Sequence, residues 1–234
     1  MAGPGFFRTL GRVYGHSSLL EWRSPVGLIS SLLFAIIMGT VYHFAMHERA
    51  FDLLANVNGV MLATLFFGST ILAARSSQGE SEGGALRAVL MAPCDPSGYY
   101  LGRVLSLWQI QLFLVLIYIP LFGTLLRGGP EFEWQRYTIT FFVLGLSALS
   151  LSALGVLLGH ISRRNRLRDL LIPLIMLPTA LPVLMAAARI LQVLGPGTNI
   201  ESTLNLPRLL ALLAPAALYC SLGSMLYHVL TADE

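Results

Sequence analysis

Six runs of predominantly apolar residues, each 21 to 25 residues long, occupy most of this 234-residue chain. The hydrocarbon core of a bilayer is about 30 Å thick, and a helix needs about 20 apolar residues to cross it. Only 12% of the residues are charged, against about a quarter in a soluble domain. We therefore predict an all-α integral membrane protein, a single transmembrane domain over residues 1–234. Its six predicted spans are Val26–Met46, Leu53–Ala74, Val104–Leu126, Tyr137–Ile161, Leu170–Leu194 and Leu209–Leu230.

The arginines that flank these spans predict the topology. With the N-terminus inside, ten of the 15 arginines lie on the cytoplasmic side and five on the other side, and the cluster Arg163–Arg168 is the strongest anchor. This satisfies the positive-inside rule, so both termini are predicted to be cytoplasmic. The first run begins late and lacks a small-residue cleavage site, which predicts that no signal peptide is removed.

All 15 basic residues are arginine, and this excludes a P-loop nucleotide-binding site in this chain. The P-loop of ATPases needs a lysine to reach the nucleotide phosphates, so any ATPase that drives this chain must be a separate polypeptide. The net charge of +3 follows from the flanking arginines, and we predict no nucleic-acid partner. Cys94 and Cys220 form no paired spacing, and no carboxylate pair or Ser/His/Asp set lies at one membrane level. We therefore predict no catalytic residue and no metal site.

A helix is expected before the first span, over residues 6–23. Its apolar side chains recur at helical spacing while Arg8 and Arg12 take the other face, which is typical of an interfacial helix on the cytoplasmic membrane surface. The apolar side chains of this pattern are Phe6, Phe7, Leu10, Val13 and Tyr14.

Spans four and five carry the most distinctive helix-packing signals. Gly155-x-x-x-Gly159 in span four permits a close helix approach, either in a homodimer seam or, as we favour, within one chain. In span five Pro173, Pro178 and Pro182 each remove a backbone donor, and lipid tolerates this only where protein or a cavity satisfies the freed groups. We predict that span five is buried and forms a hinge that moves or lines a pathway.

The polar stretch Ser76–Arg103, between the second and third spans, is the segment most suited to contact a partner. Gly83 and Gly84 form a flexible entry, residues 85–92 favour an amphipathic helix, and Pro93 ends the segment. Such a helix suits docking into a groove on another protein. A passive surface loop is the alternative.

The whole chain resembles the heme exporter protein B (CcmB) family of cytochrome c maturation, within the ABC-2-type permease pattern. The resemblance rests on Phe7-Arg8 through Arg12, Gly84-Ala85-Leu86 to Pro93, Gly155 through Arg163, Leu177-Pro178-Thr179-Ala180-Leu181-Pro182, and Pro215. It implies a permease subunit of the bacterial cytoplasmic membrane in which Ser76–Arg103 is a cytoplasmic coupling loop. The implied coupling residues are Glu80, Glu82, Gly84, Leu86, Arg87, Leu90 and Pro93. Arg87 departs from the family, where this position is often acidic.

The resemblance also implies partners for the chain in its membrane. These are a second copy of the chain, a CcmA-type ATPase that binds ATP, a CcmC-type heme-handling protein, a small CcmD-type subunit and the heme chaperone CcmE. ATP hydrolysis is expected to release the heme-loaded chaperone, while direct heme export is the older interpretation. An ABC-2 exporter of a lipid, polysaccharide or drug shares the architecture, and a membrane enzyme or a scaffold without an ATPase is an alternative of a different class.

Whether this chain itself binds heme depends on its histidines. His43 and His47 lie near the outer end of span one at a spacing of four residues, so a continuing helix would place both on one face. Histidine is a common axial ligand of heme iron. Solvated histidines at the interface are the simpler interpretation, and we predict no cofactor bound by this chain.

Overall fold

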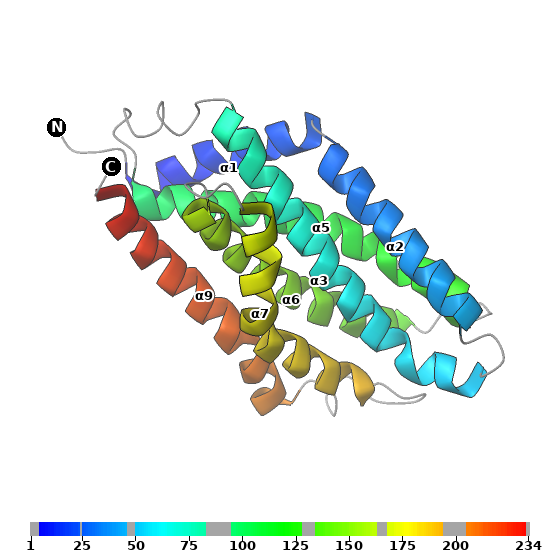
Figure 1. Cartoon of the computed structure of the whole chain (residues 1–234). Helices are drawn as coiled ribbons and strands as arrows, with labels where there is room; N and C mark the ends of the chain where they lie inside the picture. The colour runs from blue at the N-terminus through cyan, green and yellow to red at the C-terminus, as the bar shows by residue number, and fades with distance from the viewer. Residues whose placement is uncertain are drawn as a thin grey trace.

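The computed structural model describes residues 5–23, 25–45, 50–82, 95–127, 134–162, 168–193 and 205–232, and all of its secondary structure is helical. The helices are α1 (Phe6–Arg23), α2 (Val26–Ala45), α3 (Ala50–Glu82), α5 (Pro96–Arg127), α6 (Trp134–Ser162), α7 (Arg168–Gln192) and α9 (Leu206–Ala232). The last six of these are long and apolar enough to cross a membrane, which confirms the six predicted spans. Figure 1 shows these six helices side by side, with α1 lying across one end.

The predicted coupling loop is shorter than the polar stretch that suggested it. α3 continues to Glu82 and α5 begins at Pro96, so both ends of Ser76–Arg103 are helical. Asp95 explains where α5 begins, because its Oδ2 accepts a hydrogen bond from the Gly98 amide at 3.3 Å, as an N-cap side chain does. Pro96 then takes the first helical position, where its missing amide proton costs nothing. The loop boundaries at 76 and 103 are therefore wrong.

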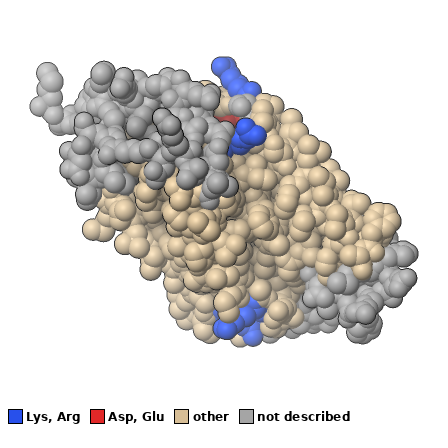
Figure 2. All heavy atoms as spheres, viewed as in Figure 1, with Lys and Arg blue, Asp and Glu red and all other residues tan. Residues whose placement is uncertain are grey.

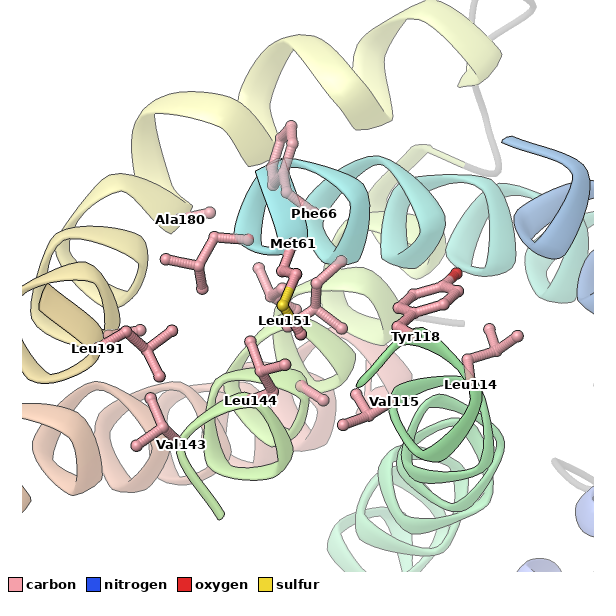
Figure 3. Close-up of a cluster of buried hydrophobic side chains, with 14 of the residues drawn as sticks. Met61, Phe66, Leu114, Val115, Tyr118, Val143, Leu144, Leu151, Ala180 and Leu191 are labelled. Carbon is pink, nitrogen blue, oxygen red and sulfur yellow. The ribbon is translucent and has the colours of Figure 1, made fainter. Parts of the chain in front are cut away.

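Helix α6 lies inside the bundle, where it packs against α3, α5, α7 and α9. Its buried residues include Val143, Leu144 and Leu151, which Figure 3 shows among side chains of the neighbouring helices such as Met61 and Leu191. The core residues labelled there are Met61, Phe66, Leu114, Val115, Tyr118, Val143, Leu144, Leu151, Ala180 and Leu191. Lipid is as apolar as these side chains, so close packing and interhelical hydrogen bonds, more than burial, hold such a bundle together.

The surroundings of Gly155 and Gly159 in α6 show whether this glycine pair packs within one chain or in a homodimer seam. A Cβ atom placed on Gly155 would lie 2.7 Å from the Cβ of Ala73 in α3, and one on Gly159 would lie 3.1 Å from the Cβ of Ser77. Both glycines therefore face α3 of the same chain. The favoured prediction, packing within one subunit, is confirmed for this pair.

Side-chain donors bind backbone carbonyls between helices and fix their register. Trp108 of α5 donates to the Gly145 carbonyl of α6 at 2.8 Å. Asn58 of α3 donates to the Leu191 carbonyl at 2.9 Å, in the last turn of α7. A polar group that lost its partner here would face hydrocarbon. Each hydrogen bond therefore favours one register of the two helices.

Candidate functional site

The end of the bundle from which the coupling loop departs contains a buried charged cluster. Arg103 of α5 is 6% exposed; its Nη2 donates to the Ser76 hydroxyl of α3, and its Nη1 lies 3.8 Å from Oε1 of Glu21 in α1. We call Glu21, Ser76, Arg103 and His160 the cytoplasmic junction. Figure 2 shows acidic beside basic atoms at this end of the molecule. A buried arginine needs such partners, because an uncompensated charge is costly away from water.

A cavity of about 20 Å³ lies inside the junction, lined by Tyr99, Arg103, Gly155 and His160 among others. That volume holds roughly one water molecule, and the lining is polar enough to bind it. The cavity is far too small for a transported substrate. In the described part of the chain, the junction therefore connects helices and encloses no more than a water-sized space.

The junction holds together both helices that lead into the coupling loop. Ser76 lies near the end of α3, which stops at Glu82, and Arg103 lies near the start of α5, which begins at Pro96. Because Arg103 binds Ser76 and also approaches Glu21, α1, α3 and α5 meet at one side chain.

Helix α1 is fastened to α5 along its length. A Cβ atom on Gly102 would lie 3.0 Å from Val13 Cβ and 3.1 Å from the Leu10 carbonyl oxygen, so this glycine permits the close crossing. Further along, the hydroxyls of Tyr14 and Ser18 donate to Oε1 of Gln109 at 2.8 and 3.0 Å.

This docking corrects the predicted orientation of α1. Phe6, Leu10, Val13 and Tyr14 are half-buried, and of the predicted apolar face Phe7 alone is fully exposed. The side of α1 expected to face lipid therefore largely faces α5. Gly98-x-x-x-Gly102 is the sequence signal that would have indicated this contact.

The three prolines of α7 lie within one continuous helix. A short hydrogen bond joins the proline-containing part of α7 to α9. The Tyr219 hydroxyl of α9 donates to the Thr179 carbonyl of α7 at 2.6 Å. The prediction that this span is buried is wrong for one face in the single chain, since Pro178 and Pro182 are exposed together with Leu174 at 70%. Pro173 is half-buried.

Several predicted site residues are not placed by these contacts. Gly84, Leu86, Arg87, Leu90, Pro93 and His47 lie outside the described residues, as do the side chains of Glu80 and Glu82 in the last turns of α3. His43 lies in the last turn of α2, half-buried, with its ring centroid 5.8 Å from that of Phe44. Among the described residues, no three histidine, cysteine or acidic side chains gather as a metal site.

Six helices long and apolar enough to cross a membrane, with α1 docked across one end, define a multi-pass membrane protein. The family model described as CcmB protein matches residues 12–224, and the chain belongs to this family. A comparison with individually curated proteins gave no match. Family membership makes the chain the membrane subunit of an ABC-type heme exporter in cytochrome c biogenesis, working with other components of that system.

Proposed function

We propose that a separate CcmA-type ATPase hydrolyses ATP and that this chain transmits the resulting movement to the periplasmic side. There the movement releases the heme-loaded chaperone CcmE. The absence of lysine supports the separate ATPase, since this chain has no P-loop. Residues 84–93 dock on that ATPase, and Leu86 is the apolar anchor of the contact. A second copy of the chain, a CcmC-type protein and a CcmD-type subunit complete the assembly.

The observation that carries this proposal is the cytoplasmic junction. Arg103 contacts both Ser76 and Glu21, so the helices on either side of the loop, together with α1, respond to the ATPase as one unit. α5 has 32 residues, and at about 1.5 Å per residue it extends about 48 Å, which exceeds the bilayer core. A tilt that begins at the junction therefore reaches the periplasmic side.

The hinge in α7 takes up part of this movement. Three prolines interrupt its hydrogen-bond ladder, so the helix bends at a lower cost than α5 or α6 would. Tyr219 holds the bent region against α9 through the Thr179 carbonyl. In this scheme Pro173, Pro178 and Pro182 set the direction in which the outer part of α7 moves.

The docking step is tested by co-purification of the ATPase with loop variants. Leu86→Asp and Gly84→Trp are expected to abolish association, because a charge or a large ring at the contact prevents docking. Ala88→Asp is the matched control for Leu86→Asp, since it adds the same charge two residues away, on the other side of a helix. Normal co-purification with Leu86→Asp at wild-type membrane abundance would show that this segment is not the contact.

The transmission step is tested separately at the junction. Arg103→Met removes the contacts to Glu21 and Ser76, and we expect the ATPase to bind and hydrolyse ATP while chaperone release falls several-fold. Arg23→Gln, at an exposed arginine of α1, is the control. If release per ATP hydrolysed is unchanged in Arg103→Met, the junction does not transmit the movement.

A further inference from the structure

A groove opens between α7 and α9 at the end of the bundle opposite the junction. Its volume is about 470 Å³, against about 20 Å³ for the junction cavity. We call it the outer groove. Among its lining residues are Pro182, Met185 and Arg189 of α7, and Arg208, Ala211 and Pro215 of α9.

The groove exists because two proline-containing helices diverge. α7 and α9 are joined near their middle by the bond from Tyr219 to the Thr179 carbonyl at 2.6 Å. Beyond this bond the end of α7 and the start of α9 separate in Figure 1, with Pro182 and Pro215 on the facing sides. Ala186 and Ala211 are too small to fill the space between them.

The mouth of the groove is positively charged. Arg189 lies in the last turn of α7 and Arg208 in the first turn of α9, so each wall contributes one guanidinium group at the outer membrane interface. Within the part of the chain that the structure describes, the residues that line the groove include no acidic side chain. Figure 2 shows a basic patch at the end of the molecule away from α1. Arginine is well suited to this position because its planar group binds phosphate oxygens in pairs.

Below the arginines, exposed apolar side chains form an apolar track along α7 and α9 toward the middle of the membrane. On α7, Leu181 and Met185 precede Arg189 at four-residue spacing and are 47% and 55% exposed. On α9, Leu218 follows Ala211 and Pro215 on the same face and is 49% exposed. Ten residues separate Arg208 from Leu218, or about 15 Å along a helix, which is about half of the bilayer core.

A charged mouth at the interface over an apolar track one leaflet deep matches an anionic amphiphile. We propose that the outer groove binds an anionic phospholipid of the outer leaflet, with its phosphate at Arg189 and Arg208 and an acyl chain along Leu181 and Leu218. Inorganic phosphate offers the same charge without the acyl chain, and the apolar track favours the lipid. This site goes beyond the proposed coupling function and does not depend on it.

The test uses the full-length chain, purified in its complex and reconstituted into nanodiscs of phosphatidylglycerol and phosphatidylcholine in equal parts. Native mass spectrometry after detergent release measures how much of each lipid remains bound. We expect selective retention of phosphatidylglycerol, with roughly tenfold weaker retention in Arg189→Gln and in Arg208→Gln, because each removes charge-assisted hydrogen bonds. Ala211→Trp keeps both charges but fills the groove, and is expected to abolish selective retention.

Ala214→Trp is the matched control, since Ala214 is exposed on α9 and does not line the groove. Equal retention of both lipids, equal retention by Ala211→Trp and Ala214→Trp, or displacement of the lipid by millimolar inorganic phosphate would each overturn the proposal. If the arginine variants fail to insert into the membrane, the comparison of Ala211→Trp with Ala214→Trp still tests whether the groove binds the lipid. Retention in Ala214→Trp together with loss in Ala211→Trp supports the site.

Discussion

The crossing of α3 and α6 yields the most quantitative prediction, because a single methyl group is enough to disturb it. In Gly155→Ala the new Cβ would lie 2.7 Å from Ala73 Cβ, which is 0.7 Å inside the 3.4 Å lower limit of ordinary contact (3.4 minus 2.7). Both atoms are attached directly to helix backbones, so neither can rotate away. The two helices must separate, and overpacking of this kind costs about 1–3 kcal/mol.

An alanine in a helix also gains about 1 kcal/mol over glycine from backbone propensity, so this gain must be measured separately. Gly59→Ala in α3 is the control, because a Cβ at this position meets nothing within 4 Å. We expect Gly59→Ala to raise the free energy of unfolding by up to about 1 kcal/mol. Gly155→Ala is expected to lower it by about 0–2 kcal/mol, the overpacking cost less the propensity gain.

Unfolding by dodecyl sulfate in mixed micelles, followed by circular dichroism, measures these free energies. The double variant Gly155→Ala/Ala73→Gly places the methyl group on the other helix and should restore the crossing. We expect a favourable coupling energy of about 1–2 kcal/mol between the two substitutions, within the range for residues in contact. Additive effects, or a Gly155→Ala variant as stable as Gly59→Ala, would refute the packing argument.

The other predictions concern the contacts of α1 and of the α7 hinge. Gly102→Leu should force α1 away from α5, because even a Cβ there lies 3.0 Å from Val13 Cβ; faster proteolysis of α1 in membranes tests this, and unchanged proteolysis contradicts it. Gln109→Leu removes the acceptor of two α1 hydroxyls and should cost about 1–3 kcal/mol; an unfolding free energy equal to the wild type would show that water replaces the bond. Tyr219→Phe removes the 2.6 Å bond to Thr179 and should cost about 1 kcal/mol, and hydrogen exchange should rise in the middle of α7 but not in α6.

The spans and the family were accessible from sequence because each depends on local information. A run of apolar residues long enough to cross a bilayer has few other stable states, so the six spans were confirmed to within a few residues, apart from the extensions of α3 and α5. Asp95 and Pro96 show how such an extension could have been recognised. They form an N-cap and a first helical position, but they lie within a polar stretch that was treated as a coupling loop.

The candidate site was less accessible, because its contacts join residues far apart in the chain. Arg103 was counted as one of the flanking arginines, while its buried contacts to Ser76 and Glu21 depend on how α1 and α3 pack. The same applies to α1, whose periodicity predicts an amphipathic helix but does not distinguish lipid from α5 as the surface it covers. Likewise, only the fold shows that α1 supplies both donors to Gln109 of α5.

The sequence by itself determined the six apolar spans and the family, because hydropathy and the family's motifs are local properties of the residues. The tertiary structure decided which faces of these helices meet. Lipid solvates any apolar side chain about equally well, so hydrophobicity does not decide which helix faces meet. That depends on shape and on hydrogen bonds that only packed helices bring together. Gly155 against Ala73 and the divergence of α7 from α9 at the outer groove are decided in this way.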